Sequence, residues 1–245
     1  LPYPLRISAL TATYASQSAL FTPWRSRRNH SLPERIVFLD CSLSSIMCAH
    51  MILDASSDAD LHMVTDRFEV GMYGEAPGII SESGWPIARD HWLSRTGFNH
   101  PGAGDTAIRS SWLKKSMAIS LAERGAHFHT GTRTTEESTG GKEVTLSYPG
   151  GKTTTRISFD YIVAANQVSD RVWRGAVTTK RPSGEYITGR RPDGTYEVWW
   201  ERAVQPLNPL QLMEWEGEDP REALRDAATL AASKLSNIMK QGLLT

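Results

Sequence analysis

Three polar side chains follow a short apolar segment, and the two serines among them could donate hydrogen bonds to an anion. Asp40, Ser42 and Ser45 come directly after Ile36–Leu39, at spacings of two and three residues. A serine hydroxyl can donate a hydrogen bond to a phosphate group, whereas an ionised carboxylate repels it. Two like charges about 4 Å apart repel by roughly 4 kcal/mol at an effective dielectric constant of 20. At such a turn Asp40 would oppose a bound phosphate, unless its side chain turns away or pairs with Arg35 or Arg109.

Histidines occur in two settings that could support catalysis or metal binding. His127 and His129 alternate along a predicted strand, so both imidazoles would point to the same face. No third ligand is near them in the sequence, and we expect solvated strand histidines rather than a metal site. His91 and His100 fall in a segment rich in glycine and proline, where a general base is an alternative to a structural role.

The cysteines and the missing sequence motifs argue against several kinds of site. Cys41 and Cys48 are the only cysteines, which is too few for a disulfide framework, and they form no CxxC pair. We expect small buried thiols in a reducing compartment rather than nucleophiles. The sequence contains neither a GxSxG elbow nor a Walker loop.

The overall composition excludes several classes of partner. The 27 basic and 27 acidic residues give a net charge of 0, so no global field attracts nucleic acid. The apolar runs are far shorter than the roughly 18 residues of a membrane-spanning helix, and no span is predicted. A chain of 245 residues makes one large domain, or one domain with a small appendage.

The first 33 residues differ from the rest of the chain. Residues 1–33 contain four arginines and no aspartate or glutamate, and they are rich in serine and threonine. We interpret them as a basic, acid-free N-terminal arm. This composition is typical of an organelle transit segment, and a partner-binding extension and a disordered tail are the alternatives. A cytoplasmic or organelle-matrix location is expected.

Hydrophobic periodicity predicts the elements that position the polar side chains. Segment 35–40 is expected to be a buried strand, 46–53 a helix and 61–65 a second strand. This unit of about 30 residues has the length of a βαβ crossover between parallel strands. Segment 108–123 predicts a helix that ends at Gly125.

Strands and one more helix are expected in the second half of the chain. The patterns predict a β-meander over segments 126–130, 143–148 and 156–165, the last of which returns as a buried strand. A hairpin is expected over segments 184–189 and 195–202, and a final helix over 221–240. Trp199 and Trp200 in the hairpin, together with Trp215, would form either an aromatic pocket wall or an exposed interface patch.

The polar turn occupies the place of a nucleotide-binding motif. Asp40, Ser42 and Ser45 stand at the three glycine positions of G-x-G-x-x-G, the opening of dinucleotide-binding folds. Asp66 follows the second strand, at about the place where an acid binds an adenosine ribose. The match in length and apolar pattern needs no gap, but the glycines themselves are absent.

Later segments are similar to one enzyme family in the same order. Segment 159–172 resembles the D-x-V-V-A-A-D-G-x-x-S-x-V-R strand of flavoprotein monooxygenases and geranylgeranyl reductases, with Asn166 and Gln167 replacing its Asp-Gly. Segment 68–78 is similar to the family's glycine-rich turn, and segment 108–125 to its helix that opens with arginine. Gly217-Glu-Asp219 resembles its Gly-Asp motif.

This resemblance implies an α/β protein: an FAD/NAD(P)-binding Rossmann-like three-layer fold with a β-meander and a reduced substrate region. It places a degenerate FAD-binding-like domain at residues 34–175, and a short β-hairpin region with the C-terminal helix at residues 176–245. FAD is the implied cofactor, with Arg109 facing its phosphates, Asp66 its ribose and Asp219 its ribityl and phosphate part. A solvated helix-start arginine and a strand-end cap are the alternative roles of Arg109 and Asp66.

Two functions follow from the resemblance. One is a flavin-dependent oxidoreductase of the monooxygenase or reductase type with an eroded phosphate-binding loop, in which segments 71–78 and 85–92 line the pocket for a small-molecule substrate. The alternative is a non-catalytic relative that serves as a scaffold or assembly subunit. Such a protein would bind a partner subunit through its N-terminal arm and its Trp-rich segments.

Overall fold

The computed structural model of the chain describes residues 33–71, 75–81, 84–95, 98–137, 142–148, 150, 154–165, 169–202, 204–206 and 208–242. Residues 1–32, which make up nearly all of the predicted arm, lie outside this description, as do Asn166 and Gln167. The arm therefore stays a prediction. Among the described residues, no helix is both long enough and apolar enough to cross a bilayer.

A parallel sheet forms the centre of the fold. It contains β1 (Arg35–Phe38), β2 (Asp60–Val64), β3 (His127–His129) and β7 (Tyr161–Val163), in the order β3-β2-β1-β7, with every neighbouring pair parallel. Helix α1 (Leu43–Ala55) connects β1 to β2, which confirms the predicted βαβ unit. The expectation that segment 126–130 begins the meander is wrong, because β3 follows a crossover helix and pairs parallel to β2.

A small antiparallel sheet covers one face of the parallel sheet. It consists of β4 (Arg133–Glu137), β5 (Glu143–Ser147) and β6 (Thr154–Ser158), in the order β4-β5-β6. Its buried side chains pack against Val37 and Val64 of the parallel sheet. The predicted strand over 156–165 is in fact two strands, β6 and β7, which belong to different sheets.

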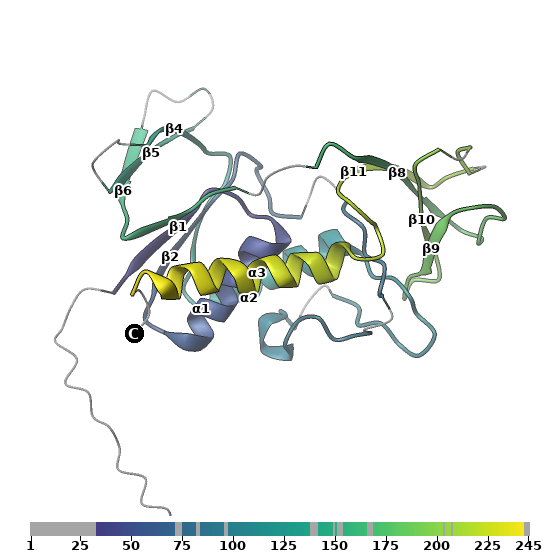
Figure 1. Cartoon of the computed structure of the whole chain (residues 1–245), viewed down its shortest axis with the longest axis horizontal. Helices are drawn as coiled ribbons and strands as arrows, with labels where there is room; N and C mark the ends of the chain where they lie inside the picture. The colour runs from purple at the N-terminus through teal and green to yellow at the C-terminus, as the bar shows by residue number, and fades with distance from the viewer. Residues whose placement is uncertain are drawn as a thin grey trace, which may run out of the picture. The chain divides into compact units, whose positions relative to one another are not determined.

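Helices cover the other face, so the fold has three layers, as Figure 1 shows. Ile36 and Phe38 point from β1 into this helical layer, while Val37 between them points to the meander. The helical layer contains α1, α2 (Ser110–Glu123) and α3 (Ala223–Lys240), and a short 3-10 helix, η1 (Asp90–Trp92), lies beside α2. Helix α2 confirms the helix predicted over 108–123. Helix α3 packs along α1, which explains why α1 is apolar on most sides.

A second antiparallel sheet follows the parallel sheet in the chain. It contains β8 (Val172–Thr178), β9 (Ile187–Arg190), β10 (Tyr196–Trp200) and β11 (Gln211–Glu216), in the order β11-β8-β10-β9. The antiparallel pairing of β9 with β10 confirms the predicted hairpin. Strand β8 crosses the predicted boundary between residues 175 and 176, and that division of the chain stays a prediction.

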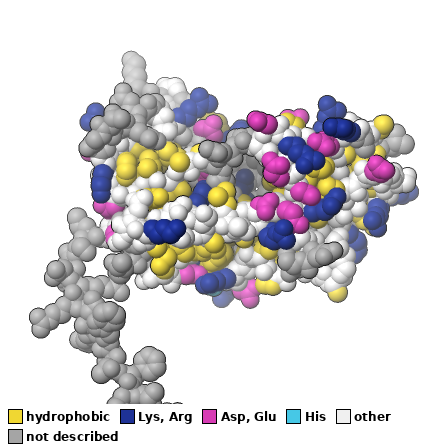
Figure 2. Space-filling view, viewed as in Figure 1, with side chains coloured by type: hydrophobic (Ala, Val, Ile, Leu, Met, Phe, Trp, Pro, Cys, Tyr) yellow, Lys and Arg dark blue, Asp and Glu magenta, His cyan; other side chains and the backbone are white. Residues whose placement is uncertain are grey.

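Basic and acidic side chains are interspersed on the face drawn in Figure 2. This mixture matches the net charge of 0 for the whole chain. Among the described residues of this face, basic side chains are mixed with acidic ones rather than gathered in one patch.

Candidate functional site

A crevice opens where β1 and β2 end, and we call it the strand-end crevice. Its volume is about 340 Å³, and its walls come from three segments, Leu39–Cys41, Val64–Asp66 and Thr132–Thr134. In open α/β sheets, ligands bind outside the carboxyl ends of the parallel strands. The crevice therefore lies where a nucleotide is expected, and it brings Asp40 and Asp66 together, 26 positions apart in the sequence.

The turn between β1 and α1 satisfies its own hydrogen-bond donors. Ser42 is the N-cap of α1, and its hydroxyl accepts a hydrogen bond from the Ser45 N–H at 3.3 Å. Asp40 Oδ1 accepts hydrogen bonds from the Ser42 N–H at 3.0 Å and from the Ser42 hydroxyl at 2.9 Å. The carboxylate thus sits at the positive end of α1, where dinucleotide-binding proteins hold a diphosphate.

Two lysines that the sequence analysis did not single out place positive charge near this turn. Lys234 of α3 donates a hydrogen bond from Nζ to Ser45 Oγ at 2.7 Å. Burial lowers the pKa of Lys234, and the attraction of Asp40 opposes that shift. Burial also lowers the pKa of Lys114 in α2, against the attraction of the Glu75 and Asp40 carboxylates. Neither lysine belongs to a local motif, so only the packing of α2 and α3 reveals them.

The crevice contains a thiol that is unsuited to nucleophilic catalysis. Cys41 lies on its wall, and burial together with the charge of Asp40 raises its pKa to about 12. The thiol therefore stays protonated near neutral pH, and only a thiolate is a good nucleophile. Burial likewise raises the pKa of Cys48 on α1 to about 12.

Asp66 lies directly after β2, at the rim of the crevice. Its half-exposed carboxylate is 3.7 Å from Arg67 Nε and 3.9 Å from Arg133 Nη2. These long, solvent-exposed ion pairs are weak, so the carboxylate can still accept hydrogen bonds from a ligand. Its role on a ribose stays a prediction.

Arg109 and Asp219 lie apart from the segments that line the strand-end crevice. Arg109 precedes α2, where its guanidinium is 3.8 Å from Glu75 Oε2 and stacks 5.2 Å from the centre of the Trp112 ring. It borders a separate small cavity of about 120 Å³. Asp219 precedes α3 and accepts a hydrogen bond from the Arg221 N–H at 2.9 Å. The predicted contacts of both residues with a cofactor stay predictions.

An aromatic cavity lies on the second antiparallel sheet. Its volume is about 560 Å³, and its aromatic walls are Trp173, Tyr186, Trp199 and Trp200. Trp199 and Trp200 are almost completely buried. Of the two alternatives for these tryptophans, a pocket wall is therefore the one that their burial favours.

Among the described residues, one group has ligand atoms close enough together for a metal ion. Asp60, His62 and His127 come from β2 and β3, and their ligand atoms lie within 4.8 Å of one another. Asp60 and His127 begin their strands, so this group lies toward the ends opposite the crevice.

No protein-family model matches the chain, and no curated protein matches it. Solved structures do resemble it. A flavoprotein/dehydrogenase from Cytophaga hutchinsonii has a TM-score of 0.53 at 11% identity, over 86% of this chain and 79% of that chain. The OxyS anhydrotetracycline hydroxylase from Streptomyces rimosus has a TM-score of 0.51 at 11% identity, over 84% of this chain and 62% of the hydroxylase. CabE, an aromatic hydroxylase from angucycline biosynthesis, has a TM-score of 0.50 at 12% identity, over 84% of this chain and 63% of that chain.

These structures confirm the predicted fold class. The chain has the α/β, FAD/NAD(P)-binding Rossmann-like fold, and its resemblance to flavoprotein monooxygenases holds at the level of the fold. The chain spans less than two thirds of the length of the hydroxylases. An activity does not follow from a fold alone, so the function has to be argued from the site.

Proposed function

We propose that the chain is a flavin-dependent oxidoreductase of the monooxygenase or reductase type, with the adenosine end of FAD in the strand-end crevice. The observation that carries this proposal is the position of the crevice, outside the carboxyl ends of β1 and β2 and bordered by Asp40 and Asp66. The fold shared with flavoprotein structures supports it. When bound, the flavin would supply the redox chemistry.

The crevice fits the two halves of an ADP group unequally. In this proposal the Asp66 carboxylate accepts hydrogen bonds from ribose hydroxyls, and Arg67 and Arg133 lie beside it. A diphosphate would need the Ser42 N–H, which already donates to Asp40. Binding therefore has to displace a carboxylate or tolerate its charge, at a cost of up to roughly 4 kcal/mol. We expect the wild-type protein to bind FAD weakly.

FAD affinity in matched variants tests this proposal. Replacing Asp40→Asn removes the charge and preserves the shape, so we expect FAD to bind roughly 100-fold more tightly than to the wild type. Ser42→Gly should raise the affinity less, because glycine is also a tolerated N-cap residue. Asp66→Asn should weaken binding, and Asp170→Asn, on an exposed residue outside the crevice, should have no effect.

Titration of FAD followed by flavin fluorescence gives the dissociation constants. Protein loaded with FAD should absorb at about 450 nm, the usual band of an oxidised flavin. An Asp40→Asn variant that binds FAD no better than the wild type would show that the turn does not face a phosphate.

The second candidate is a non-catalytic scaffold or assembly subunit. The internal pairing of Asp40 with the Ser42 N–H favours it, because this carboxylate takes the place of the phosphate. Two exposed apolar side chains at the outer strand β11, Leu210 and Leu212, provide a surface for a partner. Protein that stays colourless with FAD, in both the wild type and Asp40→Asn, would support this candidate. A cytoplasmic or organelle-matrix location remains our proposal for either function.

A further inference from the structure

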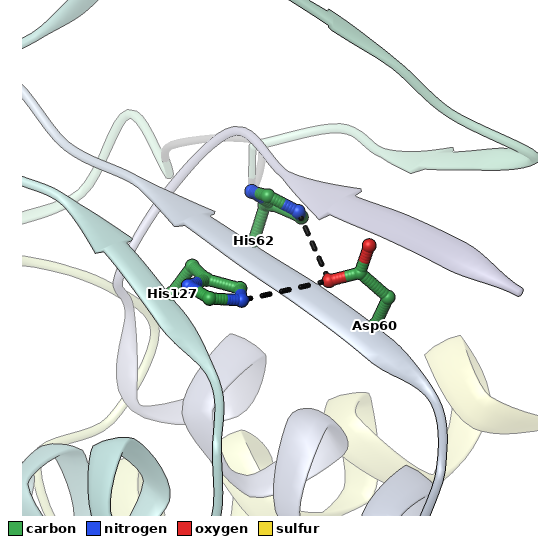
Figure 3. A group of neighbouring side chains, drawn as sticks. All are labelled: Asp60, His62 and His127. Carbon is green, nitrogen blue, oxygen red and sulfur yellow. Dashed lines mark ion pairs between the residues drawn. The ribbon is translucent and has the colours of Figure 1, made fainter. Parts of the chain in front are cut away.

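An aspartate and two histidines from neighbouring parallel strands point at one another. His62 and His127 face each other in the register of β2 and β3, and Asp60 lies two residues before His62 on the same face of the sheet. Figure 3 shows both imidazoles directed at one carboxylate oxygen of Asp60. Asp60 Oδ1 is 3.1 Å from His62 Nε2 and 3.8 Å from His127 Nε2.

The ring nitrogen of His62 that faces Asp60 is buried without a hydrogen bond. Within the described ranges, His62 Nε2 has no hydrogen-bond partner, although the carboxylate is close. His62 Nδ1 is 2.9 Å from His129 Nε2. When Nδ1 donates to His129, the lone pair on Nε2 faces the negative carboxylate, an arrangement that a cation between them would stabilise. In the other tautomer, a buried N–H lacks an acceptor, which is unfavourable.

Residues around the group hold it in the orientation that a metal ion requires. Arg35 Nε donates to Asp60 Oδ2 at 2.6 Å, which directs Oδ1 toward the imidazoles. His129 can accept the Nδ1 proton of His62. Metal-binding histidines and carboxylates are typically fixed by such outer hydrogen bonds. The whole constellation therefore has the inner and outer contacts of a metal site.

We propose that Asp60, His62 and His127 bind a divalent transition-metal ion, with Zn²⁺ as the reference case. Two imidazoles and one carboxylate suit Zn²⁺ and its neighbours better than Mg²⁺ or Ca²⁺, which prefer oxygen ligands alone. Ligand atoms around a tetrahedral Zn²⁺ are roughly 3.3 Å apart, and Asp60 Oδ1 lies 3.1 Å and 3.8 Å from the two Nε2 atoms. The side chain of His127 is 61% exposed, so the ion can enter from solvent and keep a position open to water. The site depends only on β2, β3 and Arg35, and its test does not depend on FAD.

Isothermal titration of tag-free, chelator-treated full-length protein with Zn²⁺ tests the proposal. We expect one ion per chain and a dissociation constant below roughly 10 µM. At a Zn²⁺ concentration 100 times the dissociation constant, the melting temperature should rise by roughly 5–10 °C. Mg²⁺ at the same concentration should produce no such shift. Absence of Zn²⁺ binding would overturn the proposal.

Matched variants identify the ligands. His127→Gln leaves the fold intact because the side chain is largely exposed, and it should weaken Zn²⁺ binding by more than roughly 100-fold. His129→Gln removes the hydrogen-bond partner of the ligand His62 and should weaken Zn²⁺ binding by roughly 10–100-fold. His100→Gln, on an exposed loop histidine, is the control and should bind like the wild type. Equal Zn²⁺ affinity in the His127→Gln and His100→Gln variants would also overturn the proposal.

Discussion

The hydrogen bonds of His50 fix both its tautomer and its charge. This histidine is completely buried in α1, where Nε2 donates to the Met117 carbonyl oxygen at 3.0 Å. A carbonyl can only accept, so the proton is on Nε2, and Nδ1 accepts from Arg124 Nη1 at 2.8 Å. Burial and the nearby guanidinium lower the pKa of His50 to about 4, although the Met117 hydrogen bond opposes the shift. His50 is therefore neutral in the folded protein.

Because His50 is neutral in the folded protein, we expect the protein to lose stability in mild acid. The unfolded chain binds a proton at His50 near pH 6.5, whereas the folded protein does so only near pH 4. Stability from His50 is thus complete above pH 6.5 and falls as the pH drops to 4, by up to about 3 kcal/mol. A His50→Gln variant should lose about that much less between pH 7 and pH 4 in urea unfolding. Identical pH profiles for the variant and the wild type would contradict this account.

At the scale of elements, a glycine in β8 leaves space for a buried tryptophan ring of the neighbouring strand β10. Gly175 pairs with Trp199 in the register of the two strands. The Trp199 ring is completely buried, and its Nε1 donates to Glu197 Oε1 at 2.7 Å. A Cβ atom on Gly175 would lie 2.6 Å from the ring, so only glycine leaves space for it. The hydrogen bond keeps the ring from moving aside.

Replacing this glycine should disturb the sheet core. We expect Gly175→Ala to lower the free energy of unfolding by about 1–3 kcal/mol, because the added methyl group overpacks the strand. Gly102→Ala is the matched control, since the nearest atom to its new Cβ is 3.6 Å away. Chemical denaturation of both variants compares the two sites. A smaller loss at Gly175 than at Gly102 would show that the ring is free to shift.

At the scale of the whole described structure, a buried ion cluster ties the second antiparallel sheet to the segment between β2 and η1. Arg191 Nη2 is 2.6 Å from Glu197 Oε2 and 3.5 Å from Glu75 Oε1. Glu197 Oε1 also accepts a hydrogen bond from the Gly78 N–H at 2.7 Å. Burial raises the pKa of Glu197, and Arg191 opposes that shift. The carboxylate therefore depends on its guanidinium partner.

Removing that partner should be costly. We expect Arg191→Leu to destabilise the protein by about 3–5 kcal/mol, because it leaves a buried carboxylate unpaired. The adjacent Arg190 pairs with Asp105 at 3.4 Å while its side chain is 50% exposed, so Arg190→Leu should cost less than about 1 kcal/mol. Thermal unfolding followed by calorimetry measures both. Similar losses from the two substitutions would show that burial does not decide the strength of these pairs.

Local patterns were sufficient for the parts of the fold in which neighbours in sequence are neighbours in space. The βαβ unit, helix α2 and the β9–β10 hairpin follow from short stretches of periodicity and turn residues. The same unit brings Asp40, Ser42 and Asp66 to one edge, because parallel strands end at the same side of a sheet. Periodicity does not encode which strands pair with each other. It therefore could not predict that β3 pairs with β2, or that segment 156–165 divides into two strands of different sheets.

The sequence by itself determined the βαβ unit and the polar turn after β1, because both arise from contacts within about 30 residues. Only the tertiary structure decided that Lys234 reaches Ser45, 189 positions away, and that Asp60 and His62 meet His127. A residue spacing contains no information about which distant strands or helices pack together. That choice is made by the burial of apolar surface over the whole chain, and it brings these distant charged and metal-ligating groups together.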